Sequence, residues 1–562
     1  MRQRTISALS LGVLIVLLAF SWLLMSAGQV AAGRFVLAFF PLLVILFGVA
    51  FLRQSGLTMA FVGLFAAIVL AVFQFGTPFE VTLGASGVGF LKSLGISVSV
   101  AATMLMIFLM KEAGALETVS KVIKRQVEGN EVQALYIGIG FGSFLTSLGV
   151  VTPALFPPLL VTMGFTPAAS VAIAVLGYDP TTSFSLLSIP ITLPAQIGGL
   201  NPVEMAFKIS LFLPLVSTGF AFAILWLVGG KASMKRGAVP AVISGLALAF
   251  ACLGSVAIDY FSGVEYVPLR IVGVVGGLSA MLVLYVYQKF RNKVNANVEE
   301  TVNTNYPSRK QVIRAFSPWM MLTVLAVIVS VPQVGAWLTT VLGGSEVVTV
   351  FADQRVDLDV LSQIYTWIFV AVALSLFTLK MTGKQVKSAF MTWLKRFVGP
   401  FLCYSIYFCI AFVMAFSAME IVNGALEPSG LFDHLNMNIV LGTTLAAVFG
   451  AGYVFVAASL GLFGAVVGGS ETSSNVLFLS IQRTAATDVG LNEAGFMTVY
   501  GSHAVAGGIA SSVTPAKINN AVVTIDADRG TESMIMRKHL IVALLLTMAT
   551  GVLTAVFVSI GI

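Results

Sequence analysis

Residues 134–160 read ALYIGIGFGSFLTSLGVVTPALFPPLL, an apolar stretch broken by closely spaced glycines and prolines. Its length exceeds the roughly 20 apolar residues that a helix needs to cross a bilayer. Glycine and proline interrupt the helix that such a run would otherwise form. Irregular backbone at membrane depth persists only where it lines a cavity or is buried in protein. The stretch therefore predicts a helical membrane protein with broken helices in its interior.

The composition of the whole chain supports this interpretation. Of the 562 residues, 58% are hydrophobic and 10% are charged, whereas soluble proteins carry about 25% charged residues. Mean hydropathy is +0.98, which excludes a soluble globular protein. The net charge of +7 reflects basic loops between membrane spans, so the predicted partners include the lipid bilayer and no nucleic acid.

The predicted fold is an all-α polytopic membrane protein with about 12–14 transmembrane segments, arranged as two inverted repeats with broken, re-entrant helices. A polar stretch at 289–315 is interpreted as a cytoplasmic linker between an N-terminal repeat, 1–288, and a C-terminal repeat, 316–562. Two apolar regions, 133–203 and 458–525, are interrupted. Simple spans are expected at 6–27, 34–52, 57–75, 90–110, 205–229, 239–258, 268–288, 316–340, 361–379, 397–419, 437–457 and 540–561.

The loops alternate in the sign of their charge. Lys124 and Lys387 belong to basic loops, whereas Asp357 and Asp433 belong to loops that are poor in cations. Basic loops face the cytoplasm, so we expect a multi-pass protein of the cell membrane with a cytoplasmic N-terminus and an external C-terminus. The apolar run at 6–25 is longer than the 7–15 residues of a signal-peptide core and is expected to be a retained helix.

The second interrupted region repeats the theme of the first. Phe141-Gly142 leads to a hydroxyl-rich break, and Phe463-Gly464 leads to another. Interrupted segments in corresponding positions of two halves are typical of transporter binding sites. The alternative is close packing of small residues, which explains the glycines but not the polar residues. The candidate substrate-binding residues are Gly142, Thr146, Ser147, Thr181, Thr182, Ser470, Thr472, Ser473, Ser474, Asn475 and Lys517.

Three residues are candidates for proton coupling: Asp179, Glu471 and His503. Ionisable groups at membrane depth are costly and functional by default, and burial favours the protonated form of a carboxyl. Asp179 equally fits a turn before Pro180, and His503 equally fits a structural histidine. Lys517 equally fits a lysine that extends to the membrane surface.

Other chemistry finds little support in the sequence. His434 and His539 fall in predicted loops and are expected to play no role. The chain has neither a nucleotide-binding P-loop pattern nor a zinc-protease pattern. We therefore expect no enzymatic activity, no catalytic residue, no metal and no cofactor.

The stretch GSETSSN at 469–475 resembles the GSDTSSN motif of the L-lactate permease family. Further agreement lies at Ile189-Pro190-Ile191, at Ser317-Pro318-Trp319 and at Lys538-His539-Leu540. The resemblance implies a secondary carrier that imports lactate, or a related 2-hydroxy monocarboxylate such as glycolate, together with protons. The alternatives are a carrier for another organic or inorganic anion, with sodium as a possible coupling ion, and a passive anion channel. The oligomeric state is left open.

The chain departs from the family pattern at three places in the presumed site. Thr146 stands where the family has a glutamate, and Asp179 stands where no acid is expected. Ser511 or Ser512 stands where the family has a lysine. The resemblance therefore carries the fold more directly than the substrate.

Overall fold

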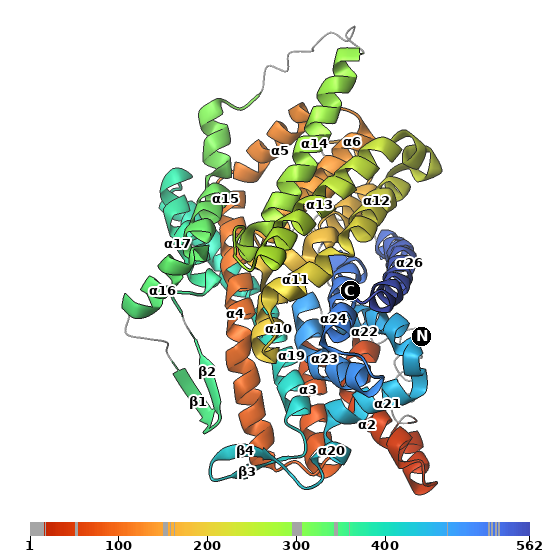
Figure 1. Cartoon of the computed structure of the whole chain (residues 1–562). Coiled ribbons are helices and arrows are strands. Elements are labelled where there is room, and N and C mark those ends of the chain that lie inside the picture. Colours follow the sequence, from red (N-terminus) through yellow and green to blue (C-terminus); the bar gives the residue numbers. More distant parts are fainter. Residues whose placement is uncertain are drawn as a thin grey trace.

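The protein is described by a computed structural model that is almost wholly helical (Figure 1). The described residues are 16, 18–50, 54, 56–149, 156–157, 159–161, 163–294, 306–341, 347–358, 360–468, 470–514, 517–518, 521–522, 525 and 529–562. Of the predicted first helix, residues 18–26 are helical, and most of the remainder lies outside the described residues.

The first helices form a scaffold that the second half of the chain completes. The elements are α2 (Val30–Ala50), α3 (Gly56–Phe73), the long α4 (Phe79–Glu112) and α5 (Ala115–Gln126). Helix α4 packs along α19 (Val398–Ala415). A Cβ on Gly89 would lie 2.7 Å from the carbonyl oxygen of Phe408, and Ser93 Oγ donates to Ser405 Oγ over 2.9 Å. Small residues on α4 thus allow the close approach.

The first interrupted region is a series of short helices: α6 (Asn130–Leu135), the π-helical η1 (Tyr136–Gly142), α7 (Ser143–Ser147), α9 (Pro167–Leu176), the 3₁₀-helical η2 (Asp179–Phe184) and α10 (Ser185–Gly198). A Cβ on Gly177 would lie 2.3 Å from Gly138 Cα, and one on Gly142 would lie 3.6 Å from the carbonyl carbon of Gly177. Close packing therefore accounts for Gly177, and also for Gly138, whose Cβ would lie 2.9 Å from Ile224 Cδ1.

The remaining elements of the N-terminal half are α11 (Pro202–Ser210), α12 (Leu213–Arg236), α13 (Ala238–Ser262), η3 (Leu269–Ile271) and α14 (Val272–Val294). Helix α14 projects beyond the bundle at the top of Figure 1. Because α14 runs to Val294 and α15 begins at Arg309, both helices extend into the predicted linker at 289–315. Residues 295–305 of that linker lie outside the described residues.

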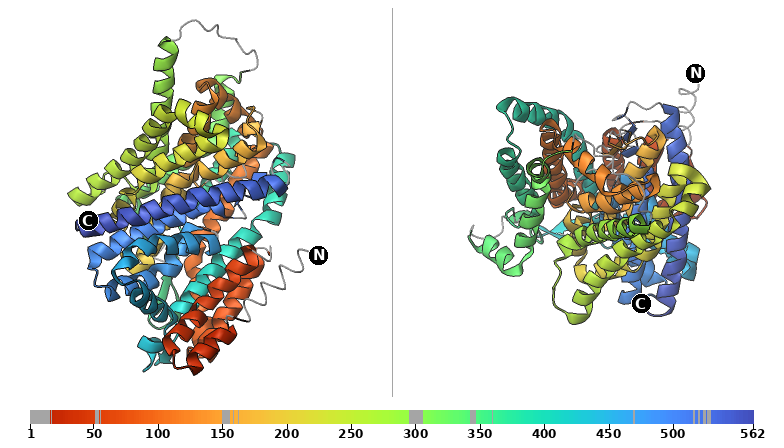
Figure 2. Two further views of the ribbon diagram at one scale, coloured as in Figure 1. Left: turned by 90° about the vertical axis from the view of Figure 1, so that its right-hand side faces the viewer. Right: turned by 90° about the horizontal axis from the view of Figure 1, so that it is seen from above.

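The C-terminal half contains α15 (Arg309–Ser330), α16 (Pro332–Val341), α17 (Ile364–Thr378), α18 (Gly383–Arg396), α19, α20 (Phe432–Leu435), α21 (Met437–Phe449), η4 (Gly450–Gly452), α22 (Tyr453–Gly468), α23 (Glu471–Asp488), α24 (Glu493–Ile509), η5 (Ala510–Val513) and α26 (Arg529–Ser559). Helix α26 crosses the bundle beside α12, α22 and α24 (Figure 2).

Two antiparallel β-hairpins, which the sequence analysis did not predict, occupy connections between helices. Strands β1 (Val347–Phe351) and β2 (Gln354–Asp357) form one, and β3 (Met419–Val422) and β4 (Ala425–Pro428) form the other. Ala352 N donates to Gly424 O over 2.8 Å, and Leu426 N donates to Asp353 Oδ1 over 2.8 Å. Burial acts to raise the pKa of Asp353, but the hydrogen bonds from Leu426 N and Gln354 together outweigh this effect and hold the pKa below its usual value.

The helices are long and apolar enough for a membrane. Among the described residues, 8 helical segments of at least 18 residues meet that standard, and three shorter apolar helices accompany them. The chain is a multi-pass membrane protein. The predicted span 90–110 lies within the longer helix α4, which begins at Phe79. The predicted span 397–419 ended too late, because the chain turns into β3 after Ala415.

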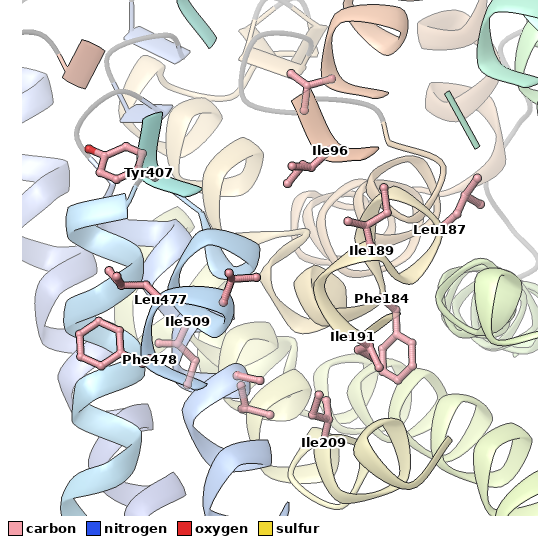
Figure 3. Close-up of a cluster of buried hydrophobic side chains, with 14 of the residues drawn as sticks. Ile96, Phe184, Leu187, Ile189, Ile191, Ile209, Tyr407, Leu477, Phe478 and Ile509 are labelled. Carbon is pink, nitrogen blue, oxygen red and sulfur yellow. The ribbon is translucent and has the colours of Figure 1, made fainter. Parts of the chain in front are cut away.

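The buried core is continuous through both halves of the chain. Figure 3 shows Ile96 of α4, Phe184 of η2 and Leu477 of α23 within one cluster. The interrupted regions therefore lie inside the core, and each of their polar groups needs a specific partner there.

Candidate functional site

The two interrupted regions, far apart in the sequence, meet around Gly508 of α24. A Cβ on Gly508 would lie 3.0 Å from Glu471 Oε2, 3.3 Å from Thr182 Cβ and 3.7 Å from the carbonyl oxygen of Asp179. A Cβ here would make unusually tight contacts with both breaks, so glycine favours this close approach of α24. The structure thus brings together the acids that the sequence analysis singled out in each half.

The two breaks share a pattern of sequence and local geometry. The same number of residues separates Thr181 from Thr472 and Asn201 from Asn492. Each break is followed by a helix, a Gly-Leu-Asn turn and a second helix. In each turn the glycine has a positive φ: 62° at Gly199 and 83° at Gly490. The N–H of the following leucine donates to the carbonyl oxygen five residues earlier, as is typical of helix C-termini. Leu200 N donates to Ala195 O over 2.8 Å, and Leu491 N donates to Ala486 O over 2.9 Å. This likeness is local, and the inverted orientation of the repeats stays a prediction.

In the first break, the backbone at the start of α10 adopts a left-handed conformation. Leu186, Leu187 and Ser188 have φ of 49, 57 and 66 degrees. Left-handed conformations cost a non-glycine residue roughly 1–2 kcal/mol. Ser188 Oγ donates to Leu269 O over 2.7 Å, which ties this turn to η3. The strained turn separates η2 from the regular part of α10.

The second break is organised by the N-terminus of α23. Ser470 is the N-cap residue, and its Oγ accepts from Ser473 N over 3.1 Å. Asn475 Nδ2 donates to Pro190 O over 2.9 Å. Pro194 has no N–H to donate to this carbonyl in the usual helical pattern, so the bond from Asn475 replaces the missing one and joins α23 to α10. Tyr500 OH on α24 donates to Asn475 O over 2.7 Å. These contacts fix the two broken helices against each other.

A cavity lies between the two breaks and is called the central cavity below. The space within it that the centres of water molecules can reach measures about 110 Å³. Hydroxyl groups, one carboxyl and one ammonium group face apolar side chains across it. Its lining residues are Ile96, Val100, Thr146, Gly149, Tyr178, Thr182, Ser185, Leu186, Pro190, Tyr404, Ser470, Glu471, Thr472 and Lys517.

The charged groups in and beside the central cavity are only partly compensated. Asp179 and Glu471 are buried, and none of their carboxyl oxygens has a hydrogen-bond partner among the described residues. Ser512 lies near Asp179, and Ser183 near Glu471, but outside hydrogen-bond geometry. Lys517 Nζ donates to Ser511 Oγ over 2.7 Å and lies within Coulombic range of both acids. A buried charge without a partner is costly, so the site is suited to receive a proton, a cation or a substrate group.

His503 lies behind α23 rather than on the cavity wall. Its Nε2 is 3.1 Å from Ser474 Oγ, and its Nδ1 is 2.8 Å from Gln482 Nε2. Gln482 Nε2 also donates to Ala457 O over 3.2 Å, and Tyr453 OH donates to Gln482 Oε1. This amide orientation makes Nδ1 the acceptor and leaves the ring hydrogen on Nε2, next to Ser474. Both ring nitrogens are therefore engaged in holding α23.

The predicted binding residues divide into two groups. Thr146, Thr182, Ser470, Thr472 and Lys517 line the central cavity. The others lie behind its wall and make other contacts. These are Gly142 against Gly177, Ser147 bonded to Ser143 O, Thr181 bonded to Tyr178 O, Ser473 at the N-cap, Ser474 beside His503 and Asn475 on Pro190.

Several residues of the site carried no signal in the sequence. Tyr404 of α19 and Ile96 and Val100 of α4 lie in uninterrupted apolar spans. Their place on the wall follows from tertiary packing alone. The predicted loop position of His539 was wrong, because the residue is buried in α26 with Nδ1 2.8 Å from Ser512 O.

Comparison with known proteins decides the family. A sequence model of the family described as L-lactate permease matches residues 34–561. The chain belongs to the L-lactate permease family. Glycolate permease GlcA of Escherichia coli (strain K12) is 24% identical over 92% of this chain and 94% of its own length. An L-lactate permease of Salmonella typhimurium is 23% identical over 92% of this chain and 94% of its own. The YdaH transporter of Alcanivorax borkumensis, known from its crystal structure, has 14% identity, a TM-score of 0.39 and coverage of 84% and 87% of the two chains.

Membership in the L-lactate permease family makes the protein a membrane transporter and not an enzyme. The central cavity, rather than a catalytic cluster, is then the feature to explain. Its position between two broken helices agrees with the placement of transporter sites.

Proposed function

We propose that the protein carries a small 2-hydroxy monocarboxylate, lactate or glycolate, across the cell membrane together with a proton. The observation that carries the proposal is the central cavity, in which an ammonium group, hydroxyl groups and a buried carboxyl meet. The printed names of the relatives, glycolate permease and L-lactate permease, support this substrate class.

The lining of the cavity fits each part of such a substrate. Lys517 Nζ and the N-terminus of α23 are positive and favour a carboxylate. Thr146, Thr182 and Thr472 offer hydroxyl groups that can bond to the substrate hydroxyl. Apolar side chains such as Val100 and Leu186 favour a short hydrocarbon part.

Coupling to protons follows from two like charges in one small cavity. Because Glu471 lines the central cavity, a substrate carboxylate bound in that cavity would be repelled by an ionised Glu471, so an anion binds better when Glu471 is neutral. By linkage, the bound anion in turn favours protonation of Glu471. Asp179, which lies beside Lys517, provides a second acid for the same purpose. Substrate and proton then load and unload together.

The test is uptake into proteoliposomes that contain the purified protein. Labelled L-lactate and glycolate are offered under an imposed proton gradient or sodium gradient, with pyruvate and dicarboxylates as competitors. We expect accumulation above equilibrium with the proton gradient alone, and strong competition only from small monocarboxylates. Protein-free liposomes are the control.

Three results would contradict the proposal. Accumulation that needs sodium would mean that Asp179 and Glu471 bind a metal cation. Ion flux far above carrier turnover would indicate a channel. Saturable uptake of a different anion, with no competition by lactate or glycolate, would overturn the substrate class.

A further inference from the structure

A second cavity lies next to the β1–β2 hairpin and is called the hairpin cavity here. The space within it that the centres of water molecules can reach measures about 80 Å³. Its walls come from α4, α10, the end of β2 and the start of α17. The polar groups on them are Lys92, Thr192, Gln196, Asp357 and Gln363. The resemblance to the permease family draws attention to none of these residues.

The hairpin cavity and the central cavity share two helices. On α4, the hairpin cavity is lined by Leu91, Lys92, Leu94 and Gly95, whereas the central cavity is lined by Ile96 and Val100. On α10, Thr192 and Gln196 line the hairpin cavity, whereas Leu186 and Pro190 line the central cavity. The two cavities are therefore neighbours along the same pair of helices.

Apolar side chains and the strained turn lie between the two cavities. Ile96 and Ile189 belong to the buried cluster of Figure 3, and Leu187 of the left-handed turn is buried with them. Ile189 lines the hairpin cavity, and its neighbours Leu186 and Pro190 on α10 line the central cavity. The left-handed turn at 186–188 is tied down by one hydrogen bond from Ser188.

Lys92 is the chemically distinctive residue of the hairpin cavity. It is the one charged residue of α4 between Glu80 and Lys111, and it is half-buried. It forms no ion pair with any described carboxylate. A charge in the middle of an apolar helix is costly and marks a functional site by default. An ammonium group on a cavity wall that is not held in an ion pair among the described residues can bind an anion.

We propose that the hairpin cavity is a capture site, in which Lys92 binds the carboxylate of the substrate before it passes to the central cavity. The proposal rests on the proposed function, since it takes the same small monocarboxylate as ligand. Thr192, Gln196 and Gln363 supply hydrogen bonds around the carboxylate and hydroxyl groups. Asp357 stands on the same wall and repels a second negative charge, so the cavity favours monocarboxylates over dicarboxylates.

The first test compares uptake kinetics of paired variants in proteoliposomes. Lys92→Gln should raise the apparent KM for labelled glycolate by about 3- to 10-fold and leave kcat nearly unchanged. Lys92→Arg should retain most of the affinity. Asp357→Asn should lower the KM and increase inhibition by dicarboxylates, because it removes the negative charge that repels them. The matched controls are Lys384→Gln on α18 and Asp433→Asn on α20, which lie on exposed surface away from both cavities.

The second test uses a thiol at the same position. Lys92→Cys in sealed vesicles should react from the hairpin side with a membrane-impermeant methanethiosulfonate, and glycolate should slow the reaction. A reagent that restores a positive charge should lower KM again, whereas one that adds a negative charge should raise it further.

The outcomes separate the two proposals. If the unmodified protein takes up no monocarboxylate, the proposed function is wrong. If the unmodified protein takes up glycolate but Lys92→Gln behaves like Lys384→Gln, the capture site is wrong and the proposed function stands. A Lys92→Cys thiol that is unreactive from the hairpin side, or not slowed by glycolate, also overturns the capture site.

Discussion

At the scale of single residues, the central cavity depends on an imbalance of charge. Two buried carboxyls, Asp179 and Glu471, lie within Coulombic range of one ammonium group, Lys517. With both acids ionised the cluster would carry a net negative charge in a low-dielectric interior, which is unfavourable. This imbalance supports the proposed coupling, in which we predict that a proton binds to the cluster in at least one step of the transport cycle.

Asp179→Asn tests which acid carries that proton. We expect the variant to lose uptake against a concentration gradient but to keep exchange of internal for external substrate, because exchange moves no net proton. Both are measured in the same proteoliposomes. Asp488→Asn, at the exposed end of α23, is the control. If Asp179→Asn still concentrates substrate under a proton gradient, Asp179 is structural and the proton path lies elsewhere.

Gly508→Ala tests the close approach of α24 to the two breaks. The new methyl group would meet Glu471 Oε2 at 3.0 Å and Thr182 Cβ at 3.3 Å, and overpacking of this kind costs about 1–3 kcal/mol. We expect a lower melting temperature in detergent and strongly reduced uptake. Gly254→Ala on α13 has nothing within 4 Å of its new Cβ and should be neutral. Normal uptake by Gly508→Ala would mean that the site tolerates this displacement.

At the scale of elements, the site depends on how α10 and α23 are fixed to each other. Asn475→Ala removes the bond to Pro190 O, and the loss of a buried hydrogen bond costs about 1–3 kcal/mol. Ser473→Ala removes a hydroxyl 2.9 Å from the N-cap oxygen of Ser470. We expect both variants to reach the membrane in near-normal amounts but to transport poorly.

Ser480→Ala is the control for these two variants, because Ser480 lies on the exposed face of the same helix. Expression is measured by immunoblotting and transport by initial uptake rate. Unchanged KM and rate in both Asn475→Ala and Ser473→Ala would show that residues 470–475 do not shape the substrate site.

The two β-hairpins provide a pH-dependent contact between elements. The pKa of Asp353 is lowered, because the hydrogen bonds from Leu426 N and Gln354 outweigh the effect of burial. The contribution of ionised Asp353 to the free energy of unfolding is therefore complete above the pKa of the unfolded chain, about 3.9. It is lost as the pH falls through the lower pKa of the folded protein. At pH 7, Asp353→Asn should speed amide exchange in β4. The difference from the unmodified protein should disappear in strong acid, and a difference that persists there would contradict the ionic origin.

At the scale of the whole molecule, the sequence predicted the class of fold and the two breaks but not their three-dimensional relation. Apolar runs predict helices in lipid because no other backbone can satisfy its polar groups there. The breaks were visible because residues such as Pro190 and Gly469 are poor helix formers. Spacing along the chain could not show that Asn475 contacts Pro190 or that Tyr404 lines the cavity. Those contacts arise from tertiary packing, as do the β-hairpins, whose strands are too short for a clear alternation.

The orientation of the molecule is the last prediction and follows from the distribution of charged residues. Basic residues such as Lys124 and Lys387 belong to segments that the alternation of charge predicts on one side, and Asp357 and Asp433 to segments that it predicts on the other. Because translocation retains cations on the cytoplasmic side, we expect the β-hairpins and the C-terminus outside. Single cysteines at the four positions should react with impermeant thiol reagents in two groups, from opposite sides of the membrane. The native Cys252, Cys403 and Cys409 are buried or half-buried, so the unmodified protein serves as the background. Labelling of positions 124 and 357 from the same side would reject this orientation and move the hairpin cavity to the cytoplasmic face.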